Sequence, residues 1–353
     1  MPGVDIPRYS ALHVVADQLQ MSTVRLHALA MGRAHGLVAG ALERLGLVVA
    51  ELAANIARHA KTGQIILRAV GEHTTGCIEV LALDKGPGIA DMTRAMRDGD
   101  SLAGAARRNG GFAGIRRLAD LFDIYSQPGR GTAVVAHVGG RSGHGSNGAC
   151  ADSVTHGSVG AVCVPVRGEE ECGDDWAIHV ESGRLVALLV DGLGHGPGAA
   201  VAAAAAMGGF HDVAADPPET VLDAMHTALR RTRGAALSVT LVDQTRRTAR
   251  FCGVGNVDGR VVALDTSRQL MPQSGIVGHT MPRVQAAEVP WPAGARLVMH
   301  SDGISSRWRA DQYPGLLARH PALLAGVIFR DFARARDDAT VLVLREPPAA
   351  PAE

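Results

Sequence analysis

Acidic residues end two strand-like runs in the second half of the sequence, and a glycine follows each of them. The segment "RLVALLVDG" places Asp191 before Gly192, and "RLVMHSDG" places Asp302 before Gly303. Carboxylates at neighbouring strand ends repel one another unless cations lie between them, and oxygen-only ligands select Mg²⁺ or Mn²⁺ over Zn²⁺. The pattern therefore favours a divalent-cation site over a nucleotide-phosphate cradle, and the alternating glycines after Asp191 fit a dinucleotide-binding loop poorly.

Two further acidic pairs occur directly ahead of other strand-like runs. They are Asp174 and Asp175 in "GDDW" and Asp337 and Asp338 in "DDAT". A single acidic residue beside a glycine ordinarily marks a turn and nothing more. Four acidic sites in series instead predict one cluster of carboxylates.

A second group of chemically capable residues lies on an amphipathic segment in the first half. In "LGLVVAELAANIARHA", residues 45–60, the apolar spacing predicts a helix, and Glu51 and Asn55 are four residues apart on one face. An Asn carbonyl oxygen suits Mg²⁺, and a neighbouring carboxylate can orient or deprotonate a hydroxyl group. For such a pair taken alone, a solvated polar stripe is the alternative interpretation.

Glycine-rich segments after this helix favour a nucleotide site. "LALDKGPGIADM" ends a strand at Asp84 and turns through Gly86 and Gly88, where the backbone can approach a ligand. "RRNGGFAGIRRLADLFDI" then places glycines at the start of a helix, where free N–H groups and the helix dipole favour phosphate. These glycines are Gly110, Gly111 and Gly114. The segments in this order are more specific than any one of them.

The composition limits the classes of partner. The chain has 353 residues, with 35 basic and 35 acidic residues and a formal net charge of zero, so neither nucleic acid nor an anionic membrane is an expected partner. No apolar run approaches the roughly 18–20 residues of a membrane span, and the protein is expected in the cytoplasm. The five cysteines never form C-x-x-C, so neither a zinc site nor a disulfide framework is expected.

The patterning divides the chain into two domains of a predicted α+β protein. Helical pattern followed by strands fills residues 1–138, and residues 139–158, rich in Gly, Ser, Asn and His, are expected to form a flexible linker. Strand-like runs with helical stretches among them fill residues 159–346. The Pro/Ala tail, residues 347–353, is expected to be disordered.

The first half resembles the GHKL ATPase superfamily, and "ELAANIARHAKTGQI" with "DKGPGIADMTRAMRDG" is most similar to its anti-sigma-factor kinases of the RsbT type. The resemblance covers about residues 5–138 and implies an α/β sandwich whose sheet is covered by helices on one face. It also implies that Asn55 ligates Mg²⁺, that Glu51 assists phosphoryl transfer, and that Asp84 bonds the adenine amino group of ATP. The other implied cofactor-binding residues are Gly86, Gly88, Gly110, Gly111, Gly114 and Thr132.

The glycine-rich lid of this half departs from the family's usual G-x-G-L-G pattern. Here "AARRNGGFAG" has Phe112 and Ala113 between its glycines. Binding of ATP with Mg²⁺ is therefore the expectation for the first half, and transfer of phosphate to a protein stays an open alternative.

The second half resembles the PPM metal-dependent phosphatases, specifically their bacterial SpoIIE-like and RsbX-like branch. The resemblance rests on "GDDW", "VDGLGHG", "SDGI" and "DDAT" in that order, covers about residues 155–346, and implies an αββα sandwich that binds two Mn²⁺ or Mg²⁺ ions. The implied metal ligands are Asp174, Asp191, Gly192 through its carbonyl, Asp302 and Asp337. By the same resemblance Asp191 bridges both ions and Asp174 holds the attacking water, so both are expected to be catalytic.

Together the two resemblances predict a bacterial partner-switching regulator. The expected activity is metal-dependent hydrolysis of phosphoserine or phosphothreonine on a STAS-domain antagonist protein, with a sigma factor or a phosphatase regulator as a further partner. These expectations rest on family analogy. The alternative from another class is a non-catalytic regulator that senses ATP and binds an anti-sigma-type partner.

Overall fold

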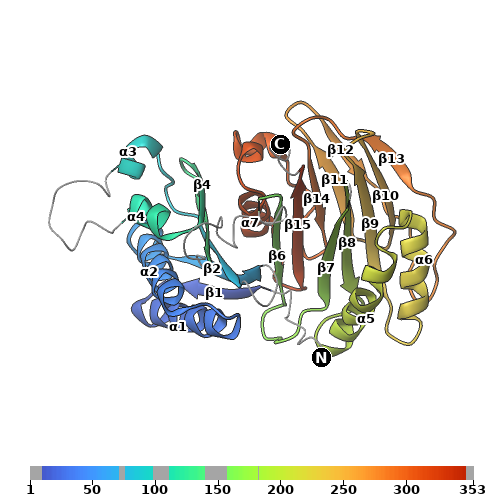
Figure 1. Ribbon diagram of the computed structural model, residues 1–353, viewed down its shortest axis with the longest axis horizontal. Helices are drawn as coiled ribbons and strands as arrows, with labels where there is room; N and C mark the ends of the chain where they lie inside the picture. The colour runs from blue at the N-terminus through green and yellow to red at the C-terminus, as the bar shows by residue number, and fades with distance from the viewer. Residues whose placement is uncertain (1–9, 71–75, 98–110, 140–156, 182, 347–353) are drawn as a thin grey trace. The chain divides into compact units, whose positions relative to one another are not determined.

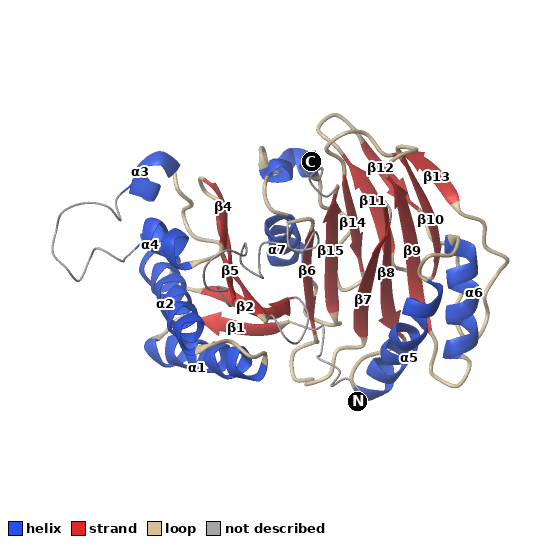
Figure 2. Ribbon diagram, in the orientation of Figure 1, coloured by secondary structure: helices blue, strands red, loops and turns tan. Residues whose placement is uncertain are grey.

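The structure is a computed structural model that describes residues 10–70, 76–97, 111–139, 157–181 and 183–346. Within these ranges the chain forms helices and β-sheets, which confirms the predicted α+β class (Figures 1 and 2). The internal contacts separate two compact units. The N-terminal unit comprises Ser10–Val159 and Asp311–Arg330, and the C-terminal unit comprises Gly160–Ala310 and Asp331–Glu346.

The N-terminal unit is built on one antiparallel sheet with the strand order β1-β2-β3-β5-β4. The strands are β1 (Ala11–Val15), β2 (Gly63–Val70), β3 (Cys77–Asp84), β4 (Leu121–Gln127) and β5 (Gly131–Gly139). The helices of the same region are α1 (Gln18–Ala34), α2 (Ala39–Asn55), α3 (Met92–Arg97) and α4 (Gly111–Leu118).

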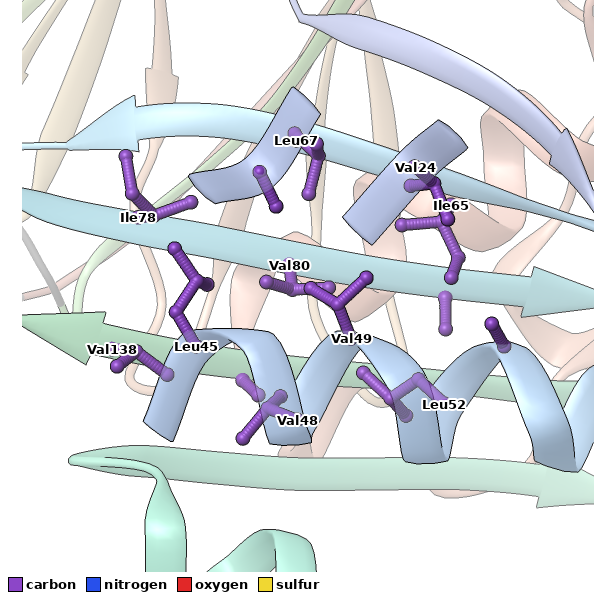
Figure 3. Close-up of a cluster of buried hydrophobic side chains, with 14 of the residues drawn as sticks. Val24, Leu45, Val48, Val49, Leu52, Ile65, Leu67, Ile78, Val80 and Val138 are labelled. Atoms are coloured by element: carbon purple, nitrogen blue, oxygen red, sulfur yellow. The ribbon is translucent and has the colours of Figure 1, made fainter. Parts of the chain in front are cut away.

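Helices cover one face of this sheet through an aliphatic core. Side chains alternate between the two faces along a strand. On β3, Ile78 and Val80 therefore point to the same side, where Leu45 and Val49 of α2 approach them (Figure 3). Helices α1 and α4 contribute to the same core. This layer of helices over one face agrees with the predicted sandwich.

The opposite face of the same sheet is covered by α7 (Pro321–Phe332), which comes from a distant part of the sequence. The alternate β3 residues Leu81 and Leu83 meet this helix. A Cβ atom on Gly326 of α7 would lie 2.8 Å and 2.9 Å from their Cδ2 atoms, so glycine allows the helix to approach the strand closely. The second cover was not predicted, because period-two alternation shows that a face is apolar but not which segment packs on it.

The C-terminal unit contains two sheets. The first has the order β13-β10-β9-β8-β7 and is covered by α5 (Pro197–Val213) and α6 (Pro218–Leu229). Its strands are β7 (Asp174–Glu181), β8 (Arg184–Gly192), β9 (Ala235–Asp243), β10 (Thr248–Val254) and β13 (Ala287–Pro290). Alanine lines the buried face of α5, which suits close packing of a helix on a sheet.

The second sheet of this unit has the order β12-β11-β14-β15-β6. Its strands are β6 (Val159–Val164), β11 (Asp258–Val262), β12 (Ser267–Leu270), β14 (Arg296–His300) and β15 (Ala339–Arg345). The buried Thr240 hydroxyl of β9 contacts Met299 of β14 at 3.6 Å, so the two sheets face each other. Along β9, the neighbouring Val239 and Leu241 point instead into the core beneath α5 and α6.

Three features bear on the sequence expectations. None of the helices in the described ranges has both the length and the apolar character needed to cross a membrane. The sequence indicated no disulfide framework, yet Cys77 is disulfide-bonded, because the spacing of cysteines along the chain does not report which of them meet in space. Cys163, Cys172 and Cys252 are free thiols. Gly110, most of the predicted linker (140–156) and the tail 347–353 lie outside the described residues.

Candidate functional site: a nucleotide pocket and a carboxylate cluster

The last turn of α2 positions the first pair of predicted residues. Glu51 and Asn55 lie one turn apart on α2, as the spacing predicted. Directly after Asn55 the helix widens into a π-helical turn, Ile56–Ala60, and Lys61 then has a φ of 67°. Single π-turns within helices frequently mark functional positions. The change of helix type therefore coincides with the residue expected to hold Mg²⁺.

A cavity of about 830 Å³ lies beside this pair, within the range of small-molecule sites. It gathers six of the predicted residues: Glu51, Asn55, Asp84, Gly88, Gly111 and Thr132. Apolar side chains, among them Ile89 and Phe112, complete the wall. Gly86 and Gly114 do not line the cavity: Gly86 lies in the turn after β3 and Gly114 is buried inside α4.

The amide of Asn55 supports the view that this cavity holds a polar ligand. Its Nδ2 atom is buried and has no hydrogen-bond partner among the described residues. A buried amide without a partner costs free energy, so such groups normally meet a ligand, an ion or water. Because the two ends of an Asn amide are interchangeable by a flip, this position can offer a donor to a phosphate oxygen or a carbonyl oxygen to Mg²⁺. Either role suits ATP with Mg²⁺.

Asp84 is held at the end of β3 by backbone donors. Its Oδ1 atom accepts hydrogen bonds from the N–H groups of Gly86 at 2.8 Å and Thr132 at 3.3 Å. Burial raises the pKa of Asp84, and these two bonds offset part of that increase. Gly88 is required in the same turn: its φ is 71°, and a Cβ atom there would lie 2.3 Å from the Gln127 carbonyl oxygen. Glycine thus allows the turn to close beside the carboxylate.

Glu51 is connected to the glycine-rich segment. Its Oε1 atom accepts a hydrogen bond of 2.8 Å from the backbone N–H of Gly111, the first residue of α4, whose φ is 72°. A free N–H at a helix start is a natural partner for a carboxylate. The carboxylate expected to assist phosphoryl transfer therefore occupies an N–H group that the sequence had assigned to phosphate.

The four acidic segments of the C-terminal unit come together at one end of its sheets. Asp174 and Asp191 are directly paired in the β7–β8 ladder. The backbone of Asp302 hydrogen-bonds the Asp191 carboxylate. A Cβ atom on Gly303 would lie 1.8 Å from the Asp338 carbonyl oxygen, so the "SDGI" and "DDAT" loops touch. The predicted clustering of acidic strand ends is therefore present.

The electrostatics of this cluster disfavour ionisation of its carboxylates. Burial raises the pKa of Asp191, and the carboxylates of Asp174, Asp302 and Asp337 raise it further. The pKa of Asp174 is raised in the same way, first by burial. Several carboxylates that disfavour each other's ionisation suit a divalent cation, which would neutralise them.

Neutral donors hold two of these carboxylates, and neither donor was singled out from the sequence. The Ser301 hydroxyl donates to Asp174 Oδ2 at 2.6 Å, and Asn256 Nδ2 donates to Asp302 Oδ2 at 2.5 Å. Ser301 had a signal, since it stands directly before Asp302 in "HSDG". Asn256 had none, because "GVGNVDG" resembles an ordinary turn.

Asp338 has a different task from its neighbour Asp337. Its two carboxylate oxygens accept the N–H groups of Val166 and Gly173, each at 2.6 Å. Gly173 directly precedes Asp174, and a Cβ on it would lie 2.8 Å from Asp338 Oδ2. Asp338 therefore fixes the approach of the "GDDW" segment, while Asp337 is one of the charges acting on Asp191.

The cluster offers carboxylate and carbonyl oxygen atoms that could act as metal ligands, but within the described ranges they do not form a closed shell. In the part of the chain that the structure describes, no three acidic, histidine or cysteine side chains converge into a closed metal shell. The residues present still fit Mg²⁺ or Mn²⁺, which take carboxylate, backbone carbonyl and water oxygens. Gly192 is at the tip of β8, beside Asp191, with its carbonyl as an additional donor group.

Comparison with known proteins gives each half a family. Residues 14–137 match the family "Histidine kinase-like ATPase domain", and residues 181–347 match "Stage II sporulation protein E (SpoIIE)". The chain is 37% identical to the serine/threonine-protein kinase RsbT of Bacillus subtilis (strain 168) over 93 residues, which are 26% of this chain and 68% of RsbT. The N-terminal half of the chain belongs to the RsbT family, and residues 181–347 form a SpoIIE phosphatase domain. The chain is a fusion of the two, as its motifs indicated.

Two further similarities concern this RsbT–SpoIIE fusion. Over 141 residues it is 25% identical to the phosphoserine phosphatase RsbX of Bacillus subtilis (strain 168), covering 39% of this chain and 70% of RsbX. A structure described as "The bacterial stressosome: a modular system that has been adapted to control secondary messenger signaling" aligns with a TM-score of 0.50 and 28% identity, covering 53% of this chain and 98% of that one.

The SpoIIE match begins after Asp174, so that residue is placed in the site by the β7–β8 pairing and not by the match.

Proposed function

We propose that this RsbT–SpoIIE fusion is a metal-dependent phosphatase that acts on phosphoserine or phosphothreonine of a STAS-domain protein and binds ATP in its N-terminal unit. The architecture is that of a partner-switching regulator, with a PPM phosphatase domain and a histidine kinase-like ATPase domain. The observation that carries the proposal is the convergence of Asp174, Asp191, Asp302 and Asp337 at one end of the C-terminal sheets.

The residues of the cluster have separate tasks in this proposal. Asp191 would be the shared metal ligand because the other three carboxylates all act on it, and Asp302 and Asp337 would supply further oxygen ligands. Asp174, held by Ser301, accepts a hydrogen bond from the water that attacks phosphorus. When bound, two Mn²⁺ or Mg²⁺ ions supply Lewis acidity for in-line displacement of the serine oxygen.

The substrate class comes from the relatives. RsbX is by name a phosphoserine phosphatase, and we carry that class to this chain. RsbT is by name a serine/threonine-protein kinase, so the two halves suggest opposed chemistry on one protein partner. A phosphorylated STAS-domain protein, or another anti-sigma antagonist, is the partner we propose; a sigma factor or a phosphatase regulator is a further partner of the same circuit.

A second candidate concerns the N-terminal unit: it senses ATP without transferring phosphate. The contact between Glu51 and the Gly111 N–H favours this candidate, because it occupies the carboxylate that would assist transfer. The cavity, the Asn55 amide and the Asp84 carboxylate support nucleotide binding in either case.

The test uses the full chain and a phosphoserine peptide. Phosphate release should require Mn²⁺ or Mg²⁺ and stop with EDTA; release that continues in EDTA would contradict the metal-dependent mechanism. In a separate reaction, labelled ATP and an unphosphorylated STAS-domain protein distinguish the two candidates for the N-terminal unit. Label on the STAS protein indicates a kinase, and nucleotide binding without label indicates a sensor.

A further inference from the structure

Arg330, near the end of α7, lies in the SpoIIE half of the sequence and contacts the backbone of Asp84, a residue that lines the nucleotide pocket. Its Nη1 atom donates a hydrogen bond of 2.9 Å to the backbone carbonyl oxygen of Asp84. The Arg330 residue is 9% exposed. Burying a guanidinium group is costly unless its N–H groups meet acceptors, and charge-assisted hydrogen bonds are the stronger kind. The contact is therefore a substantial restraint on both residues.

The restraint acts on the residue that is expected to recognise adenine. The Asp84 carboxylate is already fixed by the Gly86 and Thr132 N–H groups. The Asp84 carbonyl oxygen is contacted by Arg330 and also by Gly131, where a Cβ atom would be 2.0 Å from it. Asp84 is the last residue of β3, so the orientation of its carbonyl group affects the direction in which its side chain points into the cavity.

The position of Arg330 is set by the docking of its whole segment within the N-terminal unit. At the start of α7, the His320 backbone N–H and the Arg319 guanidinium both donate to the Asp123 carboxylate, at 2.8 Å and 3.3 Å. In the middle, Gly326 packs closely on Leu81 and Leu83. Arg330 is thus the last of three successive contacts between α7 and the sheet.

We propose that Arg330 is a positioning residue of the nucleotide pocket: it orients Asp84 and thereby sets the preference for adenine over guanine. The inference rests on the proposed function, in which Asp84 bonds the adenine amino group. Guanine has a carbonyl oxygen at that position, which a carboxylate repels. A residue within the segment that matches SpoIIE, 181–347, accordingly supports a site in the RsbT half. The RsbT half by itself lacks this contact to Asp84.

The experiment compares two non-hydrolysable nucleotides on the full chain. Calorimetry measures the dissociation constants of Mg²⁺ complexes of adenylyl and guanylyl imidodiphosphate for wild type, Arg330→Met and Arg330→Lys. The ratio of the two constants should fall by about fivefold or more in Arg330→Met, since a charge-assisted bond is lost, and Arg330→Lys should restore most of it. Arg319→Ala is the matched control: it removes an exposed ion pair on the same segment and should leave the ratio within about twofold of wild type.

Each outcome decides a separate question. A folded Arg330→Met protein with the wild-type ratio overturns the inference, and so does an equal loss of affinity for both nucleotides, which a merely structural role would cause. If circular dichroism shows that Arg330→Met is unfolded, Arg330→Gln keeps a neutral N–H donor and should lose about two- to threefold of the ratio. Wild-type protein that binds neither nucleotide would refute the nucleotide pocket itself, and with it the N-terminal part of the proposed function.

Discussion

Two buried carboxylates, Glu79 in the N-terminal sheet and Asp191 in the carboxylate cluster of the C-terminal unit, have pKa values that are shifted in opposite directions. Burial alone raises the pKa of Glu79 on β3, but Arg68 at 3.0 Å and His137 at 2.9 Å outweigh it and lower that pKa to about 2. The pKa of Asp191 is instead raised, because burial and the neighbouring carboxylates act in the same direction. At Glu79 the first unit neutralises a buried charge with its own basic side chains. In the cluster the carboxylates disfavour each other's ionisation, and a bound cation would relieve this.

The largest effect expected from this contrast is at Asp191. Asp191→Asn removes one charge and one strong oxygen ligand from the centre of the cluster, so Mn²⁺-dependent hydrolysis of a phosphoserine peptide should fall roughly 1,000-fold or more. The fold should survive, because the substitution relieves repulsion among the carboxylates. Steady-state rates against Mn²⁺ concentration, with circular dichroism for folding, measure both.

Asp223→Asn is the control, since Asp223 is an exposed acid on α6 of the same unit. It should leave the rate within about twofold of wild type. Equal activity in wild type and Asp191→Asn would mean that the cluster is not the reaction centre, and the contrast between the two units would lose its functional meaning.

The second effect concerns stability at Glu79. Its pKa is lowered in the folded protein to about 2, from 4.5, so its ionised form stabilises the fold above about pH 4.5 and this contribution is lost as the pH falls towards 2. Glu79→Gln should therefore reduce the free energy of unfolding at pH 7 by roughly 3 kcal/mol. The gap to wild type should narrow as the pH falls from about 4.5 towards 2 in urea unfolding experiments.

Glu43→Gln tests whether the loss is specific to the buried pair, because Glu43 is exposed on α2 of the same unit. Its unfolding curve should match wild type within about 0.5 kcal/mol. If Glu79→Gln were equally stable at every pH, the claim that this unit balances its buried charges internally would be wrong.

A smaller effect is expected at Asn55. Asn55→Ala removes the buried amide whose Nδ2 atom has no hydrogen-bond partner among the described residues, so affinity for Mg²⁺-ATP should fall about tenfold or more while the apo protein loses little stability. Calorimetry measures the affinity and thermal unfolding the stability. Asn256→Ala, which removes the hydrogen bond to Asp302 in the C-terminal unit, is the control and should leave ATP affinity within about twofold of wild type. An equal loss there would mean that the effect of Asn55→Ala is not specific to the pocket.

The smallest predicted effect links the two sites. After α7, the Arg334 guanidinium donates to the Asp302 carbonyl oxygen at 2.9 Å, so the chain that carries Arg330 also holds the Asp302 loop. A saturating adenylyl imidodiphosphate complex should shift the Mn²⁺ concentration for half-maximal phosphatase activity by about two- to fivefold. Because thermodynamic coupling between two binding sites is reciprocal, Mn²⁺ should change the affinity for the nucleotide by the same factor. Identical Mn²⁺ curves with and without nucleotide would show that α7 transmits nothing.

The sequence by itself determined which chemical groups each candidate site can present. The spacing of Glu51 and Asn55, the turn after Asp84 and the acidic strand ends at Asp191 and Asp302 are local patterns, and a local pattern fixes which groups a short segment can present. It also predicted the α+β class, because hydrophobic periodicity reports helices and strands directly. These features need no knowledge of what packs against them.

Only the tertiary structure decided which groups hold those residues in place. Asn256 bonds Asp302, Ser301 bonds Asp174, and Arg330 bonds Asp84 across a large separation in sequence. A buried polar side chain carries no periodicity that names its partner, and an apolar strand face does not name the helix that covers it. Contacts between distant segments depend on how the sheets and helices pack, and α7, which lies in the SpoIIE half of the sequence yet covers the RsbT-like sheet, could be placed only by that packing.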